Sequence, residues 1–162
     1  MLQKLRLKAR EERRLQTGHL WVFSNEVDAQ ATPLSGFQAG QQVQIIGQSG
    51  RILATAYVNP HSLITARILM EGETAVLERP FVAQRLRQAD ALRRTLYPRP
   101  YYRLLHGEGD LFPGLIIDRY ARHFVVQCNT AGVEGMLNPI VDVLVNDFNA
   151  ESVFGKPRVR LD

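Results

Sequence analysis

The sequence predicts an α+β protein built from two small domains, and three observations support this class. Short alternating stretches separated by glycine and proline turns dominate the first seventy residues, as is typical of a small β-barrel. Beyond residue 80, apolar residues recur with helical spacing and are followed by further strands. A polar segment, 71–73, separates the two patterns. We therefore predict a β-barrel in residues 1–73 and an α+β domain in residues 74–162.

The predicted barrel strands are defined by alternation and by turn residues. Val43 and Ile45 alternate with glutamines, and the segment 47–50 supplies a glycine turn. A second strand follows over 51–58 and ends at an Asn-Pro pair, because proline removes a hydrogen-bond donor from the ladder. Alternation resumes over 63–69, which predicts a third strand.

The second domain is predicted to begin with a helix at Pro80, because proline is tolerated in the first helical turn. One apolar face of this helix comprises Val82, Leu86, Ala89, Leu92 and Leu96. Pro98 and Pro100 end it. Strands are then expected over 102–106, 115–120 and 123–129, with a helix over 137–148 and a strand starting near 152. The pattern predicts a strand–strand–helix–strand arrangement.

The charge distribution favours a polyanionic partner. The chain carries a net charge of +4 with an isoelectric point near 9.6. Six lysines and arginines occupy the first fourteen residues, and a second group of arginines spans 79–103. We predict RNA contacts from Lys4, Arg6, Lys8, Arg13, Arg14 and Arg67. The alternative for each charged run is a solvated face without a partner.

Cysteine content and hydropathy exclude several classes of protein. Cys128 is the only cysteine, so neither an intrachain disulfide nor a cysteine-based zinc site can form, and we expect it to be a core residue. The apolar stretches are too short to span a membrane, and the basic N-terminus lacks the apolar segment of a signal peptide. We therefore expect a cytoplasmic protein without a membrane partner.

Two neighbouring sets of residues, and one tryptophan, are candidates for chemistry or binding. The glycines at 107 and 109 could belong to a nucleotide loop, but proline and a strand follow them where a helix is required, which favours a hairpin loop. His106, Glu108 and Asp110 could bind a metal ion, so a small metal-dependent hydrolase is an alternative function. Trp21 could stack on RNA bases, but we favour a role in anchoring the basic first segment on the barrel.

Three separated motifs resemble one family, the S-adenosylmethionine-dependent cytosine-5 methyltransferases of large-subunit ribosomal RNA. They are GHLWVFSNE at 18–26, NPHS at 59–62 with Arg67 in the next strand, and YRLLHGEGD at 102–110 running into PGLIIDRY at 113–120. The departures are Leu20 in place of a usual proline, and Leu111-Phe112 in place of a Gly-Leu pair. The resemblance extends over essentially the whole chain.

The resemblance implies an RNA-binding PUA domain followed by a central α+β domain. The methyl-donor loop, the Asp-Pro-Pro segment and the catalytic cysteine of the family have no counterparts here, so no catalytic residue and no cofactor-binding residue are assigned. We expect this chain to be the RNA-binding, targeting portion of a 23S ribosomal RNA cytosine-5 methyltransferase, truncated and by itself inactive. A stand-alone RNA-binding or ribosome-assembly protein is the alternative.

Overall fold

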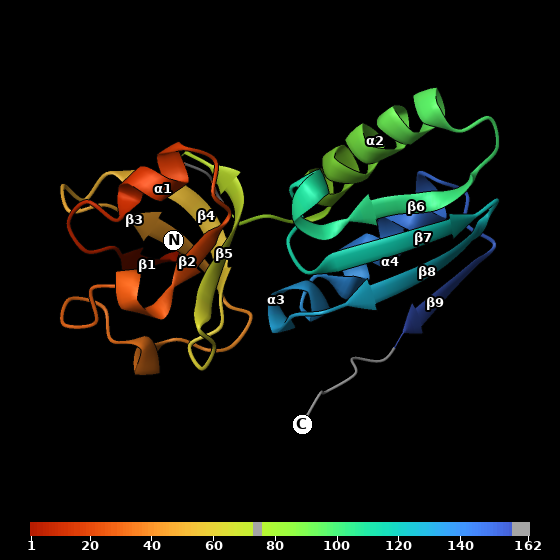
Figure 1. The fold of residues 1–162 in the computed structure, drawn as a ribbon. Coiled ribbons are helices and arrows are strands. Elements are labelled where there is room, and N and C mark those ends of the chain that lie inside the picture. The colour runs from red at the N-terminus through yellow and green to blue at the C-terminus, as the bar shows by residue number, and fades with distance from the viewer. Residues whose placement is uncertain (73–75, 157–162) are drawn as a thin grey trace. The chain divides into compact units, whose positions relative to one another are not determined.

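In a computed structural model, which describes residues 1–72 and 76–156, the chain forms two compact units that divide between Val76 and Leu77 (Figure 1). We call residues 1–76 unit 1 and the chain from Leu77 unit 2, and each is described by itself. The predicted boundary between residues 73 and 74 lies outside the described residues.

Unit 1 is a five-stranded sheet with the strand order β1-β3-β4-β5-β2. Its strands are β1 (Gln3–Arg6), β2 (Trp21–Phe23), β3 (Gln42–Ile46), β4 (Ile52–Val58) and β5 (Ile64–Glu71). One helix, α1 (Glu12–Gln16), and two short 3-10 turns, η1 (Ser24–Glu26) and η2 (Leu34–Gly36), connect them. The β1–β3 pair is parallel, whereas the other pairs are antiparallel.

The core of unit 1 contains alternate residues of β4 and β5. Ala54, Ala56 and Val58 of β4 are buried in one cluster with Ala66 and Ile68 of β5. The cluster is completed by Leu5, Leu7, Val22, Val27, Phe37, Val43 and Ile45. Strands β1 and β2 lie at the two edges of the sheet and form no ladder with each other among the described residues, so hydrogen bonding does not close a barrel. A single antiparallel bridge joins Leu7, just after β1, to Val27, just after η1.

Unit 2 is a four-stranded sheet with helices on one face (Figure 1). Its elements are α2 (Arg79–Leu96), β6 (Tyr101–His106), η3 (Gly107–Asp110), β7 (Leu115–Tyr120), β8 (His123–Cys128), α3 (Ala131–Glu134), α4 (Leu137–Asn146) and β9 (Ser152–Lys156). The strand order is β6-β7-β8-β9, and β9 pairs with β8 in parallel. Helix α2 contacts α4 and β6, and α4 also contacts β9. The predicted α+β class is therefore confirmed.

Unit 2 differs from the sequence prediction at its helices. The apolar face of α2 is buried as far as Ala89, whereas Leu92 and Leu96 are exposed because the last two turns extend past the core. The short helix α3 was not predicted; its N-cap is Thr130, whose hydroxyl accepts a hydrogen bond from the Val133 N–H. The order of elements is helix, three strands, two helices and a strand, so the predicted strand–strand–helix–strand pattern covers only part of it.

Candidate RNA interface

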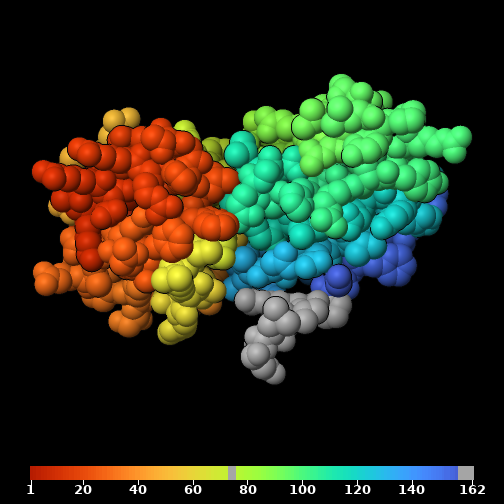
Figure 2. Space-filling view, in the orientation of Figure 1, coloured from red at the N-terminus to blue at the C-terminus, as the bar shows by residue number. Residues whose placement is uncertain are grey.

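Strand β1 and the two residues after it place three predicted RNA-contact residues on one face: Lys4 and Arg6 lie on the strand, and Lys8 follows it. Leu5 and Leu7 are buried in the core of unit 1, and side chains alternate along a strand, so Lys4, Arg6 and Lys8 project to the opposite side. Lys4 and Lys8 are exposed, and neither makes an ion pair within the described part of the chain. We call these three residues the β1 basic face. Figure 2 shows the N-terminal segment of the chain in red at the surface of unit 1.

The turn between β3 and β4 supports the β1 basic face from one side. Arg6 Nη1 donates to the backbone carbonyl of Gln48 at 3.3 Å, and Gln48 Nε2 donates to the carbonyl of Leu7 at 2.9 Å. These bonds orient Arg6 while its positive charge keeps no carboxylate partner among the described residues. Arg10 and Arg51, which were not assigned from sequence, are also exposed in unit 1. Eight lysines and arginines face five carboxylates within residues 1–72, so unit 1 is basic overall.

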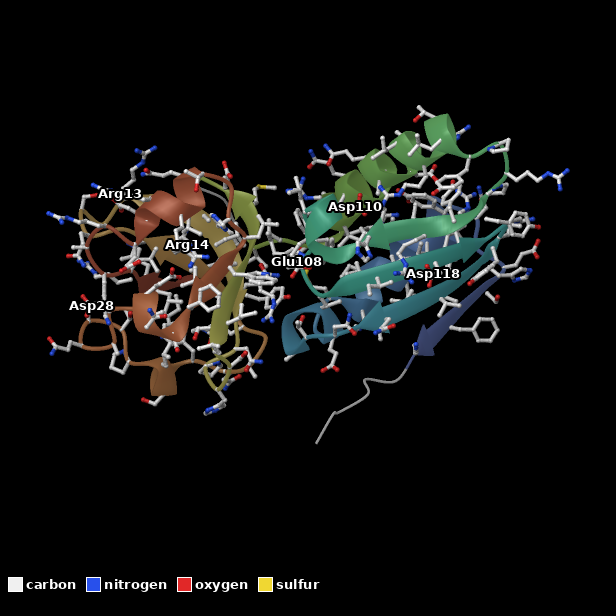
Figure 3. The ribbon with its side chains drawn as sticks, viewed as in Figure 1. Arg13, Arg14, Asp28, Glu108, Asp110 and Asp118 are labelled. Atoms are coloured by element: carbon white, nitrogen blue, oxygen red, sulfur yellow. The ribbon has the colours of Figure 1, made fainter. Side chains whose placement is uncertain are left out.

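Arg13 and Arg14 leave α1 in different directions (Figure 3). Arg13 is exposed, with no ion pair in the described chain, so it remains a candidate for phosphate contact. Arg14 instead donates to Glu26 Oε1 at 2.5 Å, and its guanidinium lies 5.0 Å from the centre of the Phe23 ring. Glu26 is buried and also accepts from the Phe23 N–H at 2.7 Å. The charge of Arg14 is therefore neutralised inside unit 1 by Glu26.

Arg67 lies apart from the β1 basic face. It is on β5, and β3 and β4 lie between β5 and β1 in the order of the sheet. Its Nη1 atom donates to the Ile64 carbonyl at 3.4 Å, and it pairs in register with Trp21 of β2. Trp21 is 38% exposed and lies edge-on to Phe23, and the guanidinium of Arg14 on α1 lies over that Phe23 ring; anchoring of the first segment by Trp21 stays a prediction.

The loop between β6 and β7 does not present the three predicted metal ligands together. Both carboxylate oxygens of Asp110 accept from Arg93, at 2.5 and 2.7 Å, and one also accepts from the His106 N–H at 2.6 Å. Residues 1–72 and 76–156 contain no group of three histidine, cysteine or acidic side chains that could hold a metal ion. Asp110 therefore links the loop to Arg93 of α2. Figure 3 labels Asp110 below that helix.

The same loop does not fit S-adenosylmethionine. Gly107 and Gly109 lie in the four-residue turn η3, which runs through Leu111, at φ 57°, toward β7. A methyl-donor loop connects a strand to a helix whose N-terminal N–H groups face the ligand, and this loop connects two antiparallel strands. The predicted hairpin loop is confirmed.

Cys128 is a core residue, as predicted. It is at the end of β8 and 9% exposed. Burial, together with the nearby carboxylate of Glu134, raises the pKa of the thiol to about 11. A nucleophilic cysteine requires the opposite shift, because only the thiolate attacks.

Comparison with known proteins finds a match to a domain family within unit 1. Residues 5–71 match the model of the PUA-like domain. Unit 1 contains a PUA-like domain. The match covers every strand of the five-stranded sheet except the first two residues of β1, so Leu5, Arg6 and Lys8 fall within it and Lys4 lies just before it.

Relatives with similar sequences extend over both units. The chain is 34% identical over 138 residues to ribosomal RNA large subunit methyltransferase I from Aliivibrio fischeri, covering 83% of this chain and 34% of that protein. It is 35% identical to the protein of the same name from Vibrio vulnificus strain CMCP6, covering 87% of this chain and 35% of the relative. The chain is therefore homologous to ribosomal RNA large-subunit methyltransferases and spans about a third of their length.

Two solved structures share the fold. A candidate methyltransferase crystallised with SAH superposes with a TM-score of 0.80 at 19% identity, over 97% of this chain and 40% of that chain. A candidate SAM-dependent methyltransferase from Streptococcus mutans gives a TM-score of 0.78 at 19% identity, over 96% and 40%. At this identity the likeness concerns the fold. Within the described residues, no helix has the length and apolar character needed to cross a bilayer.

Proposed function

We propose that this chain is the RNA-binding, targeting portion of an S-adenosylmethionine-dependent methyltransferase that modifies a cytosine at C5 in 23S ribosomal RNA. The observation that carries the proposal is the β1 basic face within a PUA-like domain. Homology to proteins named ribosomal RNA large subunit methyltransferase I supports ribosomal RNA as the partner.

The physical role proposed for unit 1 is to position RNA through its phosphates. Lys4 and Lys8 present ammonium groups without intramolecular ion pairs in the described chain, and Arg6 is oriented by the turn at Gln48. Such contacts neutralise phosphate charge and release counterions, which makes affinity depend steeply on salt. They fix the register of an RNA without reading its bases.

Methyl transfer itself is not assigned to these residues. A cytosine-5 methylation needs a thiolate that attacks C6, a donor pocket and a base that removes the C5 proton. The Cys128 thiol is protonated at neutral pH, and the loop at Gly107 does not fit the methyl donor. When S-adenosylmethionine is bound elsewhere in such an enzyme it supplies the methyl group, and the present residues would hold the RNA.

The test is RNA binding by the purified chain, measured by fluorescence anisotropy with fragments of 23S ribosomal RNA between 50 and 300 mM salt. We expect log K to fall linearly with log salt, with a slope near −3 if about four phosphates are contacted. Unrelated RNAs of the same length should bind with similar affinity. Binding that is absent at 50 mM salt, or insensitive to salt, would overturn the proposal.

A further inference from the structure

Unit 2 contains a hollow of about 670 Å³ at the end of α2, where the helix turns into β6. This volume is within the range of sites for small ligands. Residues of α2, the 97–100 loop, β6, β7 and the segment after α4 line it. Its charged lining comprises four arginines, Arg87, Arg94, Arg99 and Arg119, against two aspartates, Asp90 and Asp147. The hollow thus carries surplus positive charge.

The floor of the hollow is a fixed network. Asp90 Oδ1 accepts from Tyr102 Oη at 2.7 Å and from Arg119 Nη1 at 2.8 Å. Burial and the hydrogen bond to Asp90 raise the pKa of Tyr102, so its hydroxyl remains a donor at neutral pH. Arg119 also lies over the rings of Phe124 and Phe148. Because Asp90 and Arg119 neutralise each other, the floor supplies shape and rigidity, and the surplus charge lies at the rim.

The rim carries the arginines that lack carboxylate partners. Arg87 donates to Asp147 at 2.6 Å, and a hydrogen bond from Arg79 holds the pKa of that carboxyl below its usual value, so Arg87 is neutralised too. Arg94 and Arg99 are exposed and make no ion pair in the described part of the chain. Arg94 lies in the last turn of α2, where its positive charge offsets the partial negative charge of the helix C-terminus. Arg99 lies beyond the helix, so its charge adds to the positive charge of the rim.

An exposed aromatic ring completes the rim. Tyr97 is 49% exposed and lies 5.5 Å from the Tyr102 ring, centre to centre, with a tilt of 31°. Tyr97 is the C-cap residue of α2, with extended backbone, and it lines the hollow together with Arg87 and Arg94 of that helix. A ring held from one side by another ring can accept a base on its open side, and neighbouring guanidinium groups can bind the attached phosphate.

We propose that this hollow is a second RNA site, which takes one unpaired nucleotide with its base against Tyr97 and its phosphate between Arg94 and Arg99. The inference rests on the proposed function, because it assigns part of the RNA path to unit 2. Unpaired RNA fits better than duplex, since only an unstacked base can meet a ring inside a hollow.

The test uses the full chain and a fluorescein-labelled oligouridine of twelve nucleotides, which has no stable secondary structure. The variant Arg94→Ala/Arg99→Ala should weaken binding about tenfold and make the salt slope shallower by about 1.4, or 0.7 per single-strand phosphate contact. Tyr97→Ala should weaken binding at least about fivefold, which corresponds to the smallest usual loss on removing one base–aromatic stack. The salt slope should not change, because no charge is removed. Tyr97→Phe keeps the ring and should bind as the parent does.

A control with the same change in net charge is Arg103→Ala/Lys156→Ala, which removes two positive side chains of unit 2 outside the hollow lining; Arg103 is paired with Asp118, whereas Arg94 and Arg99 have no ion pair in the described chain. Circular dichroism establishes that each variant is folded. Photocrosslinking with one 4-thiouridine in the oligomer should yield a crosslinked peptide containing residues 94–102.

The outcomes separate this inference from the proposed function. If the parent binds oligouridine and all unit 2 variants bind equally, or if crosslinks map only to unit 1, the second site is wrong while RNA binding by unit 1 stands. If the control loses as much affinity as Arg94→Ala/Arg99→Ala, the effect is general charge and the site is refuted. If oligoglutamate competes as well as oligouridine, the hollow is a site for acidic peptide. A parent without RNA binding overturns both proposals.

Discussion

Arg14 on α1 and Glu26 on η1 form a 2.5 Å ion pair that links the N-terminal segment to the sheet of unit 1. The side chain of Glu26 is only 7% exposed, and its second oxygen accepts the Phe23 N–H. The sequence places Arg14 in a basic cluster with Lys4, Lys8 and Arg13, and nothing in that cluster distinguishes it. The buried carboxylate of Glu26 pairs with Arg14 inside the fold, whereas Lys4, Lys8 and Arg13 stay available to a polyanion.

We therefore expect Arg14→Ala to act on stability. Removing the partner of a buried carboxylate leaves Glu26 with an unmatched charge, which should cost about 1–2 kcal/mol, discounted because Arg14 is itself 39% exposed. Thermal unfolding followed by circular dichroism should show a fall in Tm of roughly 4–15 °C for the domain. Arg13→Ala, one position away on the same helix, is the control and should leave Tm within about 2 °C. Equal effects of the two variants would contradict the assignment.

The β1 basic face should act on RNA affinity. Replacing Lys4, Arg6 and Lys8 together with alanine removes up to three phosphate contacts, so the slope of log K against log salt should become shallower by about 2. Affinity should fall to a similar extent for all RNAs, because phosphate contacts carry no base information. Anisotropy titrations at several salt concentrations measure both. If the triple variant keeps the slope of the parent, the face only protects an edge strand against pairing.

The Cys128 thiol should be unreactive in the folded chain. With a pKa of about 11, roughly 0.1% of it is thiolate at pH 8, against about a tenth for an ordinary thiol of pKa 9.0, so alkylation should be slower by about two orders of magnitude. Reaction with a thiol reagent, with and without guanidinium, measures the ratio. Because the folded pKa lies above the ordinary value of 9.0, this group's stabilisation is present below pH 9 and lost as pH rises toward 11. Equal rates in both states would show that the thiol is accessible.

Ala121 offers a test of the β7–β8 hairpin. It lies in the two-residue turn between Tyr120 and His123 with φ 55°, a left-handed conformation that costs an alanine about 1 kcal/mol relative to glycine. Ala121→Gly should therefore stabilise unit 2 by about that amount and raise Tm by several degrees. Ala91→Gly, the same change on the exposed side of α2, should destabilise by about 1 kcal/mol. Shifts of the same sign would contradict the strain at Ala121.

Finally, the chain should not bind S-adenosylmethionine. The glycines at 107 and 109 belong to a turn between antiparallel strands and offer no helix N-terminus to the donor. Isothermal titration calorimetry with the ligand at up to about 1 mM should show no heat beyond dilution. A dissociation constant in the micromolar range would mean that another part of the chain forms a donor site.

The fold class and most strands could be predicted from the sequence, because both depend on local periodicity. The alternation over 51–58 predicted the strand β4, although side chains on both of its faces are buried, and the prolines after Leu96 predicted where α2 ends. The short strands β1 and β2 were not predicted. Each has only three or four residues, and β1 pairs in parallel with a strand nearly forty residues away, which local patterning cannot reveal.

Which charges are available to a partner could not be predicted without the three-dimensional arrangement of the chain. Arg14 and Lys8 look alike in the sequence, yet Arg14 lies against a buried carboxylate brought from twelve residues away, and Lys8 faces solvent. Asp110 is likewise a candidate metal ligand in the sequence, but in the structure its carboxylate is paired with Arg93. Arginines of α2 that formed one run in the sequence divide into neutralised Arg87 and unpaired Arg94. The physical reason is that charge neutralisation depends on distances of a few ångströms between residues far apart in the chain.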